Sequence, residues 1–508
     1  MVFSTIEFLF QFLPIFLLAY YATPQKYRNI TLIIGSLVFY AIGSGWYTLL
    51  LLLSLVINYG LSRLISGSHA RHPQQAKRYL IGGLVYNFGL LVVFKYTNFL
   101  IGNLNSLLSI FHVAIPKASI IMPLGISFFT FQITSYLIDV YQNKTRPARS
   151  LLDLGVYLCM FPQLISGPIC MYSDTAETLA KGEDIRSENL IRGYMRIGWG
   201  LLKKVVIADR LYVVVQTLFD GYASYHGVMI VVAAVSYTVQ LYMEFSGCMD
   251  IVIGSAECFG VTLPENFAQP FVSKNASEFW RRWHISLGRW FKTYIFYPVS
   301  MSKLTRKWNR FAKKHTSKYI KLMVASAIAL FPVWVCNGLW HGANWSYLFY
   351  GMYYFVVIMI ELMLEPAVKK LCAAWKIAED AAWWNVLRIL KTWVIIFTGE
   401  LFFRADTLGI GMHMFRSLFH DFSIQKLWDG TLLTLGLGRV EIGIILVSLL
   451  IVGVVNHFRE QQIDVRGVIL QKRLPVRWLV YLALIFVVLI FGAYGPGYQE
   501  VDLIYAGF

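Results

Sequence analysis

The stretch that decides the fold runs from Leu322 to Ile360 and reads LMVASAIALFPVWVCNGLWHGANWSYLFYGMYYFVVIMI. Its 39 residues include no Asp, Glu, Lys or Arg, so the stretch is long and apolar enough for two membrane-spanning segments. A polar, glycine-broken island, Asn337–Ser346, lies at its centre, and we expect the two segments to join near Asn337 and Gly338. His341 is the middle residue of the run. A titratable side chain is costly in such surroundings and is by default a candidate functional residue.

Composition extends the membrane assignment to the whole chain. Hydrophobic residues make up 57% of the 508 residues and charged residues only 14%, and several windows exceed the roughly 18–20 apolar residues that cross a bilayer. No linker rich in Gly, Ser or Pro divides these windows. We therefore predict one integral domain over residues 1–508. The predicted fold is all-α and polytopic, in the cell (plasma or inner) membrane, with about eleven or twelve spans plus re-entrant and interfacial helices.

The apolar windows give the order of the expected spans. Residues 5–22 have no preceding basic region and no small-residue cleavage site, which favours a retained first span over a signal peptide. Residues 29–62 are interrupted by Gly43-Ser-Gly45 and predict two spans or a broken helix. Residues 154–173, with two prolines and a glycine, predict a broken or re-entrant segment. The other expected spans are 79–94, ending at Lys95 before an interfacial segment, then 118–138, 221–243, two within 322–360, 386–403, 440–458 and 478–495.

The formal charge of +17 is concentrated in one segment. Residues 274–321 contain thirteen Lys and Arg and a single acid, which predicts a cytoplasmic location by the positive-inside tendency. The segment Ser277–Phe291 reads SEFWRRWHISLGRWF. At helical spacing, Phe279, Trp283 and Trp290 share one side, a pattern typical of a helix lying in the membrane interface.

Two roles are open for this basic segment. It anchors the chain to anionic membrane lipid, or it also gathers an anionic cytosolic substrate such as a nucleotide-bearing thioester. In the second interpretation, Arg281, Arg282 and Arg289 lie on the acyl-donor side. A nucleic-acid partner is not predicted, because the charge adjoins membrane spans and no nucleic-acid motif accompanies it.

Two of the ten histidines stand out from the rest, which lie in basic loops or near span ends. His284 follows Trp283, and His341 follows Trp340, each beside small or hydrogen-bonding residues. For His341, a side chain satisfied within a helix-breaking turn is as good an interpretation as a catalyst. As a catalyst, its neutral imidazole would accept a proton from an attacking hydroxyl and return one to a leaving group.

Further polar residues support the catalytic interpretation of His341. Asn337 or Asn344 could hold one ring nitrogen so that the other faces the reactants. Glu244 and Asp250 are either in a solvated inter-helix turn or, if buried, paired or protonated at the edge of a cavity. Glu400 and its neighbours offer charges for such pairing. The six cysteines show no metal-ligand spacing, so no metal site is predicted.

Several motifs together resemble one known family. They are Pro123–Gln132, Phe161–Pro168, Gln240–Gly254, Leu263–Phe267, Phe279–Phe291 and Asn337–Trp345. Their order and content are similar to those of membrane-bound O-acyltransferases, and most similar to the bacterial branch typified by the membrane subunit of alginate O-acetylation. The resemblance covers roughly residues 5–505. It implies a ring-like core of helices, thin at its centre, with a tunnel through the membrane.

The resemblance also implies a chemistry. The position of His341 is the family's essential catalytic residue, and that of His284 is the second position associated with activity. Bacterial relatives take an acyl group from a cytosolic thioester, commonly acetyl-CoA, without a bound cofactor, for O-acetylation of an extracytoplasmic or secreted polysaccharide. A partner acetyltransferase with a Ser/His/Asp site often completes delivery. Glu244 stands where relatives often have Asp, and Cys248 where they have Tyr, which leaves the acceptor open.

The resulting hypothesis has a donor and an acceptor side. The acyl-CoA or acyl-carrier donor approaches from the basic cytoplasmic segment, and a polysaccharide or protein hydroxyl approaches from the other mouth. His341 acts as general base, and His284 positions or polarises the thioester. The residues expected to line the substrate tunnel or to support the site are Trp340, Asn337, Asn344, Trp283, Glu244 and Asp250. The alternatives are D-alanylation of teichoic acid from a carrier protein and a non-enzymatic role in polysaccharide transport.

Overall fold

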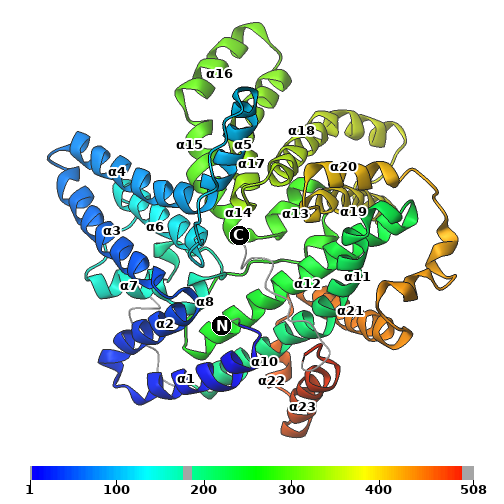
Figure 1. The fold of residues 1–508 in the computed structure, drawn as a ribbon, viewed down its shortest axis with the longest axis horizontal. Helices are drawn as coiled ribbons and strands as arrows, with labels where there is room; N and C mark the ends of the chain where they lie inside the picture. The colour runs from blue at the N-terminus through cyan, green and yellow to red at the C-terminus, as the bar shows by residue number, and fades with distance from the viewer. Residues whose placement is uncertain (1–2, 176–185, 495–508) are drawn as a thin grey trace. The chain divides into compact units, whose positions relative to one another are not determined.

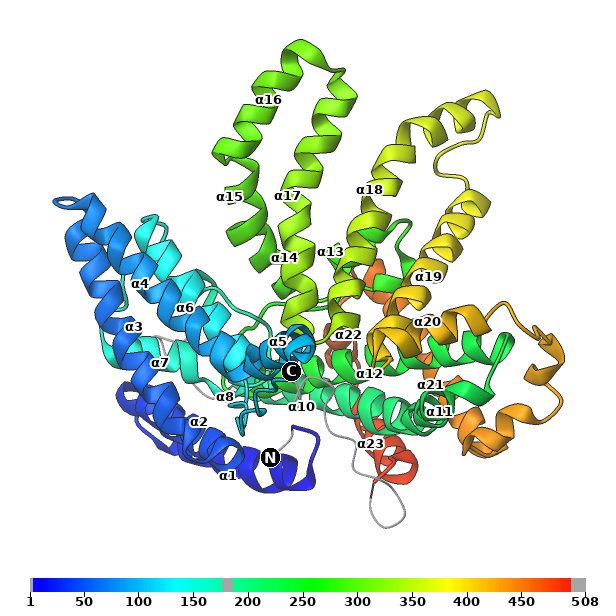
Figure 2. The same cartoon turned by 45° about the horizontal axis from the view of Figure 1, so that its top comes forward.

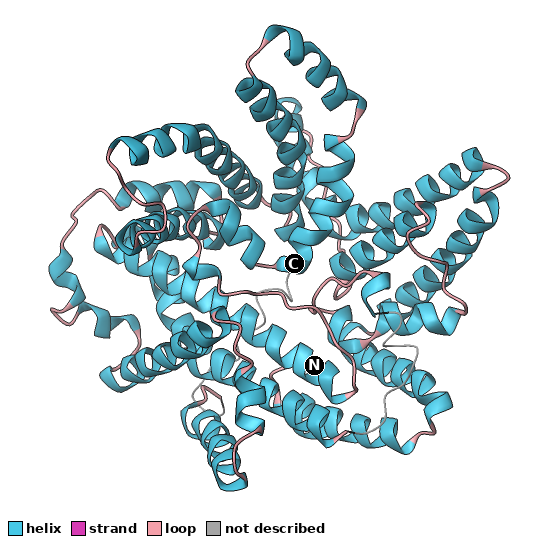
Figure 3. Ribbon diagram, turned by 180° about the vertical axis from the view of Figure 1, so that it is seen from behind, coloured by secondary structure: helices cyan, strands magenta, loops and turns pink. Residues whose placement is uncertain are grey.

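The computed structural model describes residues 3–175 and 186–494 of the chain. Within these ranges the secondary structure consists of helices joined by loops, with no β-strand and one isolated bridge between Phe267 and Trp283 (Figure 3). The contacts divide the chain into two compact units. Unit 1 contains Met1–Leu201 and Cys248–Pro264, and unit 2 contains Leu202–Gly247 and the chain from Glu265 to Val501.

Unit 1 contains three helices that pack side by side, α3 (Tyr47–His69), α4 (Pro73–Leu91) and α6 (Ile126–Tyr141) (Figure 1 and Figure 2). Buried amides join α3 to α4: Nδ2 of Asn58 donates to Oδ1 of Asn87 at 3.1 Å, and the reverse bond is 2.7 Å long. Such pairs satisfy polar groups that lipid cannot. The other elements are η1 (Glu7–Phe12), α1 (Leu13–Ala22), η2 (Gln25–Tyr27), α2 (Arg28–Ser44), η3 (Val92–Tyr96), α5 (Thr97–Leu108), η4 (Ser109–Phe111), α7 (Leu151–Cys159), α8 (Phe161–Leu164) and α10 (Ser187–Leu201).

Two predicted helix breaks in unit 1 are confirmed. Gly43-Ser-Gly45 separates α2 from α3. After α7 ends at Cys159, the chain forms the four-residue helix α8 and then leaves helical structure again at residues 165–171. The prolines and glycine of this segment account for the interruption.

Two predicted boundaries in unit 1 are wrong. The helix expected to end at Lys95 continues, so that helical structure extends over residues 73–111. The Nζ atom of Lys95 within this stretch lies 3.2 Å from the Oγ of Ser127, which gives the charge a polar partner. The helix expected from residue 118 begins only at Ile126, because Pro123 and the left-handed Gly125 (φ 71°) precede it.

Unit 2 begins with η5 (Leu202–Ala208) and includes most of the 31-residue helix α12 (Val228–Cys258), which continues into unit 1. The prediction of a span over 221–243 therefore found this helix but not its length. The other elements are α11 (Asp209–Asp220), η6 (Tyr222–Ser224), η7 (Pro270–Val272), α13 (Ala276–Arg282), α14 (Ile285–Phe291), η8 (Lys292–Phe296), α15 (Tyr297–Ser300), α16 (Lys303–His315), α17 (Lys318–His341), α18 (Trp345–Ala374), α19 (Ala382–Arg404), α20 (Leu408–Ser417), η9 (Ile424–Leu427), η10 (Thr431–Leu435), α21 (Arg439–Glu460), α22 (Val465–Leu470) and α23 (Leu474–Phe491).

The uncharged run Leu322–Ile360 lies within the hairpin of α17 and α18 (Figure 2). The turn lies at residues 342–344 and not at Asn337 and Gly338 as predicted. Gly338 and Gly351 allow close helix packing in this hairpin. A Cβ atom at Gly351 would lie 2.2 Å from the carbonyl oxygen of Trp334, and one at Gly338 would lie 2.4 Å from that of Tyr347. Both glycines therefore let the two backbones pack in direct contact.

Seven helical stretches among the described residues are long and apolar enough to cross a membrane: Tyr47–His69, Pro73–Phe111, Val228–Cys258, Lys318–His341, Trp345–Ala374, Arg439–Glu460 and Leu474–Phe491. The apolar stretch Glu7–Ala22 is shorter. Several expected spans fall below this length, such as α2 with 17 residues and α6 with 16. The fold is that of an all-α, multi-pass membrane protein.

Candidate active site

His341 is the last residue of α17 and is buried, with 3% of its surface exposed. Its imidazole packs against aromatic rings of three helices. The ring centroids lie 5.0 Å from Trp340 on α17, 5.8 Å from Tyr350 on α18 and 4.9 Å from Phe403 on α19. The predicted polar island is thus a hairpin turn and also a buried site.

A buried carboxylate, that of Glu400, is linked to His341 through Tyr350, which contacts both side chains. Glu400 on α19 is 1% exposed, and its Oε1 accepts a hydrogen bond from the Tyr350 hydroxyl at 2.8 Å. Sequence reasoning gave Glu400 a pairing role with nearby charges. The structure gives it the phenol as a partner, while Arg404 forms an ion pair with Asp406 at 3.3 Å. Tyr350 was not predicted, because one tyrosine among many aromatic residues carries no distinguishing signal.

His284 lies at a break between two short helices. The continuous interfacial helix predicted over Ser277–Phe291 is wrong: α13 ends at Arg282, and α14 begins at Ile285. His284 adopts the left-handed conformation, with φ 46° and ψ 52°. This conformation is unfavourable for a residue with a Cβ atom and recurs at functional sites. Phe279, Trp283 and Trp290, expected to lie in the membrane interface, are all buried.

A loop preceding α13 holds this break in place. The amide of Ile285 donates to the carbonyl of Asn266 at 3.0 Å. The Asn266 side chain is 1% exposed, and its Oδ1 lies 3.3 Å from Nδ1 of His284, 3.0 Å from the amide nitrogen of Ser286 and 2.9 Å from Oγ of Ser286. Burial lowers the pKa of His284 to about 3, so its imidazole is neutral near pH 7.

One indole connects the two predicted histidines. The Trp340 ring lies 5.3 Å from the His284 imidazole and 5.0 Å from that of His341, both nearly edge-on. Phe245 covers His284 from α12 at 4.9 Å. Residues that are 57 positions apart in the sequence therefore meet round a single side chain. Trp283 lies outside this contact and packs on Phe267 at 5.1 Å.

The two asparagines proposed to orient His341 have different surroundings. Asn337 is 6% exposed and lies one helical turn before His341 on α17. Asn344 caps α18 by accepting from the Ser346 amide at 3.0 Å, and its Nδ2 donates to the Asp406 carbonyl at 2.9 Å. The Asn344 side chain thus fixes the hairpin turn and an adjacent loop.

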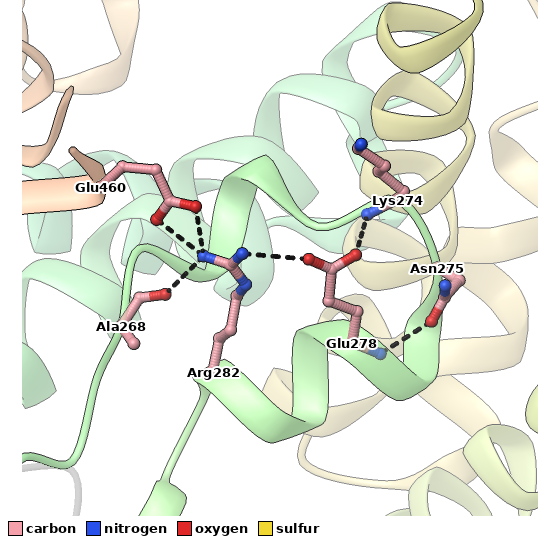
Figure 4. A network of polar contacts seen from close by, with 6 residues as sticks. All are labelled: Ala268, Lys274, Asn275, Glu278, Arg282 and Glu460. Carbon is pink, nitrogen blue, oxygen red and sulfur yellow. Dashed lines mark hydrogen bonds and ion pairs between the residues drawn. The ribbon is translucent and has the colours of Figure 1, made fainter. Parts of the chain in front are cut away.

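The three arginines predicted on the donor side also have different surroundings. Arg281 and Arg289 are exposed. Arg282 forms part of a polar network that Figure 4 shows: its Nη1 contacts both oxygens of Glu460 at 2.9 and 2.7 Å and the Ala268 carbonyl at 3.2 Å, and its Nη2 contacts Glu278 at 3.1 Å. The Glu460 carboxylate raises the pKa of Arg282. This network connects α13 with the end of α21.

The carboxylates predicted near a cavity lie inside a helix. Glu244 and Asp250 are both buried in α12, so the solvated inter-helix turn is wrong. Each has a cationic neighbour within its own unit: Lys204 is 3.7 Å from Glu244, and Arg196 is 2.9 Å from Asp250. Over the described residues, no group of three or more His, Cys, Asp and Glu side chains could hold a metal ion.

Known proteins are similar to this chain. A model of the membrane-bound O-acyltransferase family matches residues 146–313. A protein named "Probable alginate O-acetylase AlgI" from Azotobacter vinelandii is 32% identical over 88% of this chain and 84% of its own length. A peptidoglycan O-acetyltransferase from Helicobacter pylori is 31% identical over 82% of this chain and 80% of its own. A teichoic acid D-alanyltransferase from Bacillus subtilis is 28% identical over 57% and 70%.

Proposed function

Because the chain belongs to the membrane-bound O-acyltransferase family, we propose that it moves an acetyl group from cytosolic acetyl-CoA across the membrane for O-acetylation of an extracytoplasmic or secreted polysaccharide. The enzyme class is that of a multi-pass membrane O-acyltransferase. Support for a polysaccharide acceptor comes from the relatives that cover most of the chain, which are named for O-acetylation of alginate and peptidoglycan. The D-alanyltransferase matches a smaller part of it.

The observation that carries this proposal is the contact of two buried imidazoles with Trp340. In the proposed step, a hydroxyl oxygen attacks the thioester carbonyl carbon, so that a C–O bond forms and the C–S bond breaks. His341 takes the hydroxyl proton and passes it to the leaving sulfur, which gives an ester and a free thiol. Removing water from this site strengthens the polar interactions on which the step depends.

The donor side of the proposal uses the exposed arginines of the basic segment. Arg281 and Arg289 attract the phosphates of the donor, while Arg282 holds the Glu278 and Glu460 network. Donor affinity that does not fall as salt rises would exclude this attraction and leave the lipid-anchor role. An extracytoplasmic acetyltransferase with a Ser/His/Asp site is the proposed partner that completes delivery.

Labelled acetyl-CoA tests the proposed chemistry. Protein reconstituted in vesicles should release CoA and transfer label to a hydroxyl acceptor, and His341→Ala should lower the rate by about 100-fold or more. His420→Ala is the matched control, because His420 is exposed. Full activity in a folded His341→Ala protein would contradict the assignment. Turnover with an alanyl carrier and not with acetyl-CoA would favour D-alanylation, and polymer movement without acyl turnover would favour transport.

A further inference from the structure

Three potential hydrogen-bond donors surround the side-chain oxygen of Asn266, and one of them, the Ser286 amide, identifies this atom as the oxygen. The Ser286 amide can only donate, so the Asn266 atom 3.0 Å away must be the carbonyl oxygen and not the amide nitrogen. The Ser286 hydroxyl lies 2.9 Å from the same oxygen. Because Nδ1 of His284 is 3.3 Å from this acceptor, a hydrogen bond there requires the proton on Nδ1.

We propose that Asn266 is a positioning residue that fixes His284 in the Nδ1-protonated tautomer, so that Nε2 is a hydrogen-bond acceptor. A neutral imidazole carries one ring proton, and the partner of one nitrogen decides the state of the other. In this tautomer Nε2 cannot donate to a thioester carbonyl. His284 therefore holds a group that carries a proton, such as the attacking hydroxyl or an amide N–H of the donor.

The backbone supports the same arrangement. The left-handed conformation of His284 is costly and persists only where its surroundings enforce it. Asn266 contributes to this on both sides, because its carbonyl accepts from Ile285 and its side chain from Ser286. A further backbone hydrogen bond joins the loop to the helix break, because the Arg282 carbonyl accepts from the Ala268 amide at 2.9 Å. The loop and the helix break thus form one rigid frame for the imidazole.

This inference rests on the proposed function for its kinetic test. Asn266→Ala removes the acceptor and should lower kcat on the order of 10- to 100-fold with a smaller change in KM, because a free imidazole populates the wrong tautomer. Asn87→Ala is the matched control for the loss of a buried amide, and it should keep kcat unchanged. An Asn266→Ala protein with wild-type kcat would overturn the proposal.

The pH dependence of activity in Asn266→Asp distinguishes a positioning role from a purely structural one, which would not change it. The carboxylate still accepts from Nδ1, but its charge favours the imidazolium and raises the pKa of His284. The variant should therefore approach wild-type activity at high pH and lose activity at a higher pH than the wild type does. A loss that is the same at every pH would contradict the proposal. The other titratable groups on the surrounding elements are the same in both proteins: Glu244, Glu265, Glu278, Arg281, Arg282, Arg289 and His341.

Nitrogen NMR tests the tautomer independently of any activity. In protein labelled with ¹⁵N-histidine, the signals that disappear in His284→Gln should show a protonated Nδ1 and an unprotonated Nε2. Asn266→Ala should convert them to a tautomer mixture. An Nε2-protonated His284 in the wild type would overturn the proposal even if acyl transfer is observed. A fixed Nδ1–H tautomer in a protein that transfers no acyl group would instead contradict only the proposed function.

Discussion

Buried polar side chains around the site have hydrogen-bond partners on other elements. Glu400 depends on the Tyr350 hydroxyl, and no described residue forms a hydrogen bond with its second oxygen. The Nδ1 atom of His284 lies 3.3 Å from the side-chain oxygen of Asn266, which comes from a loop before α13. Leaving a buried polar group without its partner costs about 1–3 kcal/mol, whereas replacing both partners by apolar groups can be nearly neutral. These contacts therefore make single substitutions costly.

Tyr350→Phe should lower the free energy of unfolding by about 1–3 kcal/mol, because Glu400 then loses its hydrogen-bond donor. Tyr350→Phe combined with Glu400→Leu should recover most of that loss, because no unpaired carboxylate remains. Unfolding in graded SDS or by heat, monitored by circular dichroism, measures both. A double variant whose loss equals the sum of the single losses would mean that the two residues are not coupled.

Helix packing beside the site depends on positions where a side chain has no room. The hairpin of α17 and α18 brings the carbonyl of Trp334 against Gly351 and that of Tyr347 against Gly338. His341 ends α17 three residues after Gly338, so the same close approach fixes where the imidazole lies. Moving the two helices apart would shift His341 away from Tyr350 on α18.

Gly351→Ala should lower the free energy of unfolding by about 1–3 kcal/mol, because the backbone of α17 cannot yield as a flexible side chain would. Gly82→Ala on α4 is the control. Its Cβ meets no atom within 4 Å, so it should be neutral or stabilising by up to about 1 kcal/mol. Melting temperatures in one detergent compare the two. Equal effects would show that helix propensity and not contact decides the outcome.

Sequence patterns predicted an all-α fold and singled out both histidines. They did not predict the contacts that hold the two imidazoles in place. An uncharged run of 39 residues is strong evidence for two helices, and His341 is conspicuous within it. Asn266 lay within a recognised motif, Leu263–Phe267, yet its role depends on a chain reversal that no local periodicity encodes. The break at His284 was missed for a similar reason. Ser277–Phe291 has helical spacing, and only pairing with a distant loop forces the left-handed residue.

Charge along the chain predicts which side of the membrane the loops occupy. The basic residues of α16 and those following it precede the span α17 with no acid among residues 303–321. In unit 1, a basic segment follows the span α3, while Trp46 at the start of that span is exposed. Basic loops remain cytoplasmic. Arg310 and Trp46 should therefore face opposite compartments.

Cysteine labelling tests this topology. An impermeant maleimide should label Arg310→Cys in inverted vesicles only, and Trp46→Cys in right-side-out vesicles only. Native cysteines give little background, since five are buried and Cys336 is partly so. Each variant is the control for the other. Labelling of both from one side would exclude the predicted orientation.

The pairing of Arg196 has a consequence for the order of biosynthesis. This arginine is 3% exposed on α10, and its partners Asp250 and Glu257 belong to the end of α12. The chain between them, Leu202–Gly247, belongs to the other unit. A growing chain therefore lacks both of these partners of Arg196 until more than fifty further residues have been made. Part of unit 2 is therefore synthesised before unit 1 has all the residues of its interior.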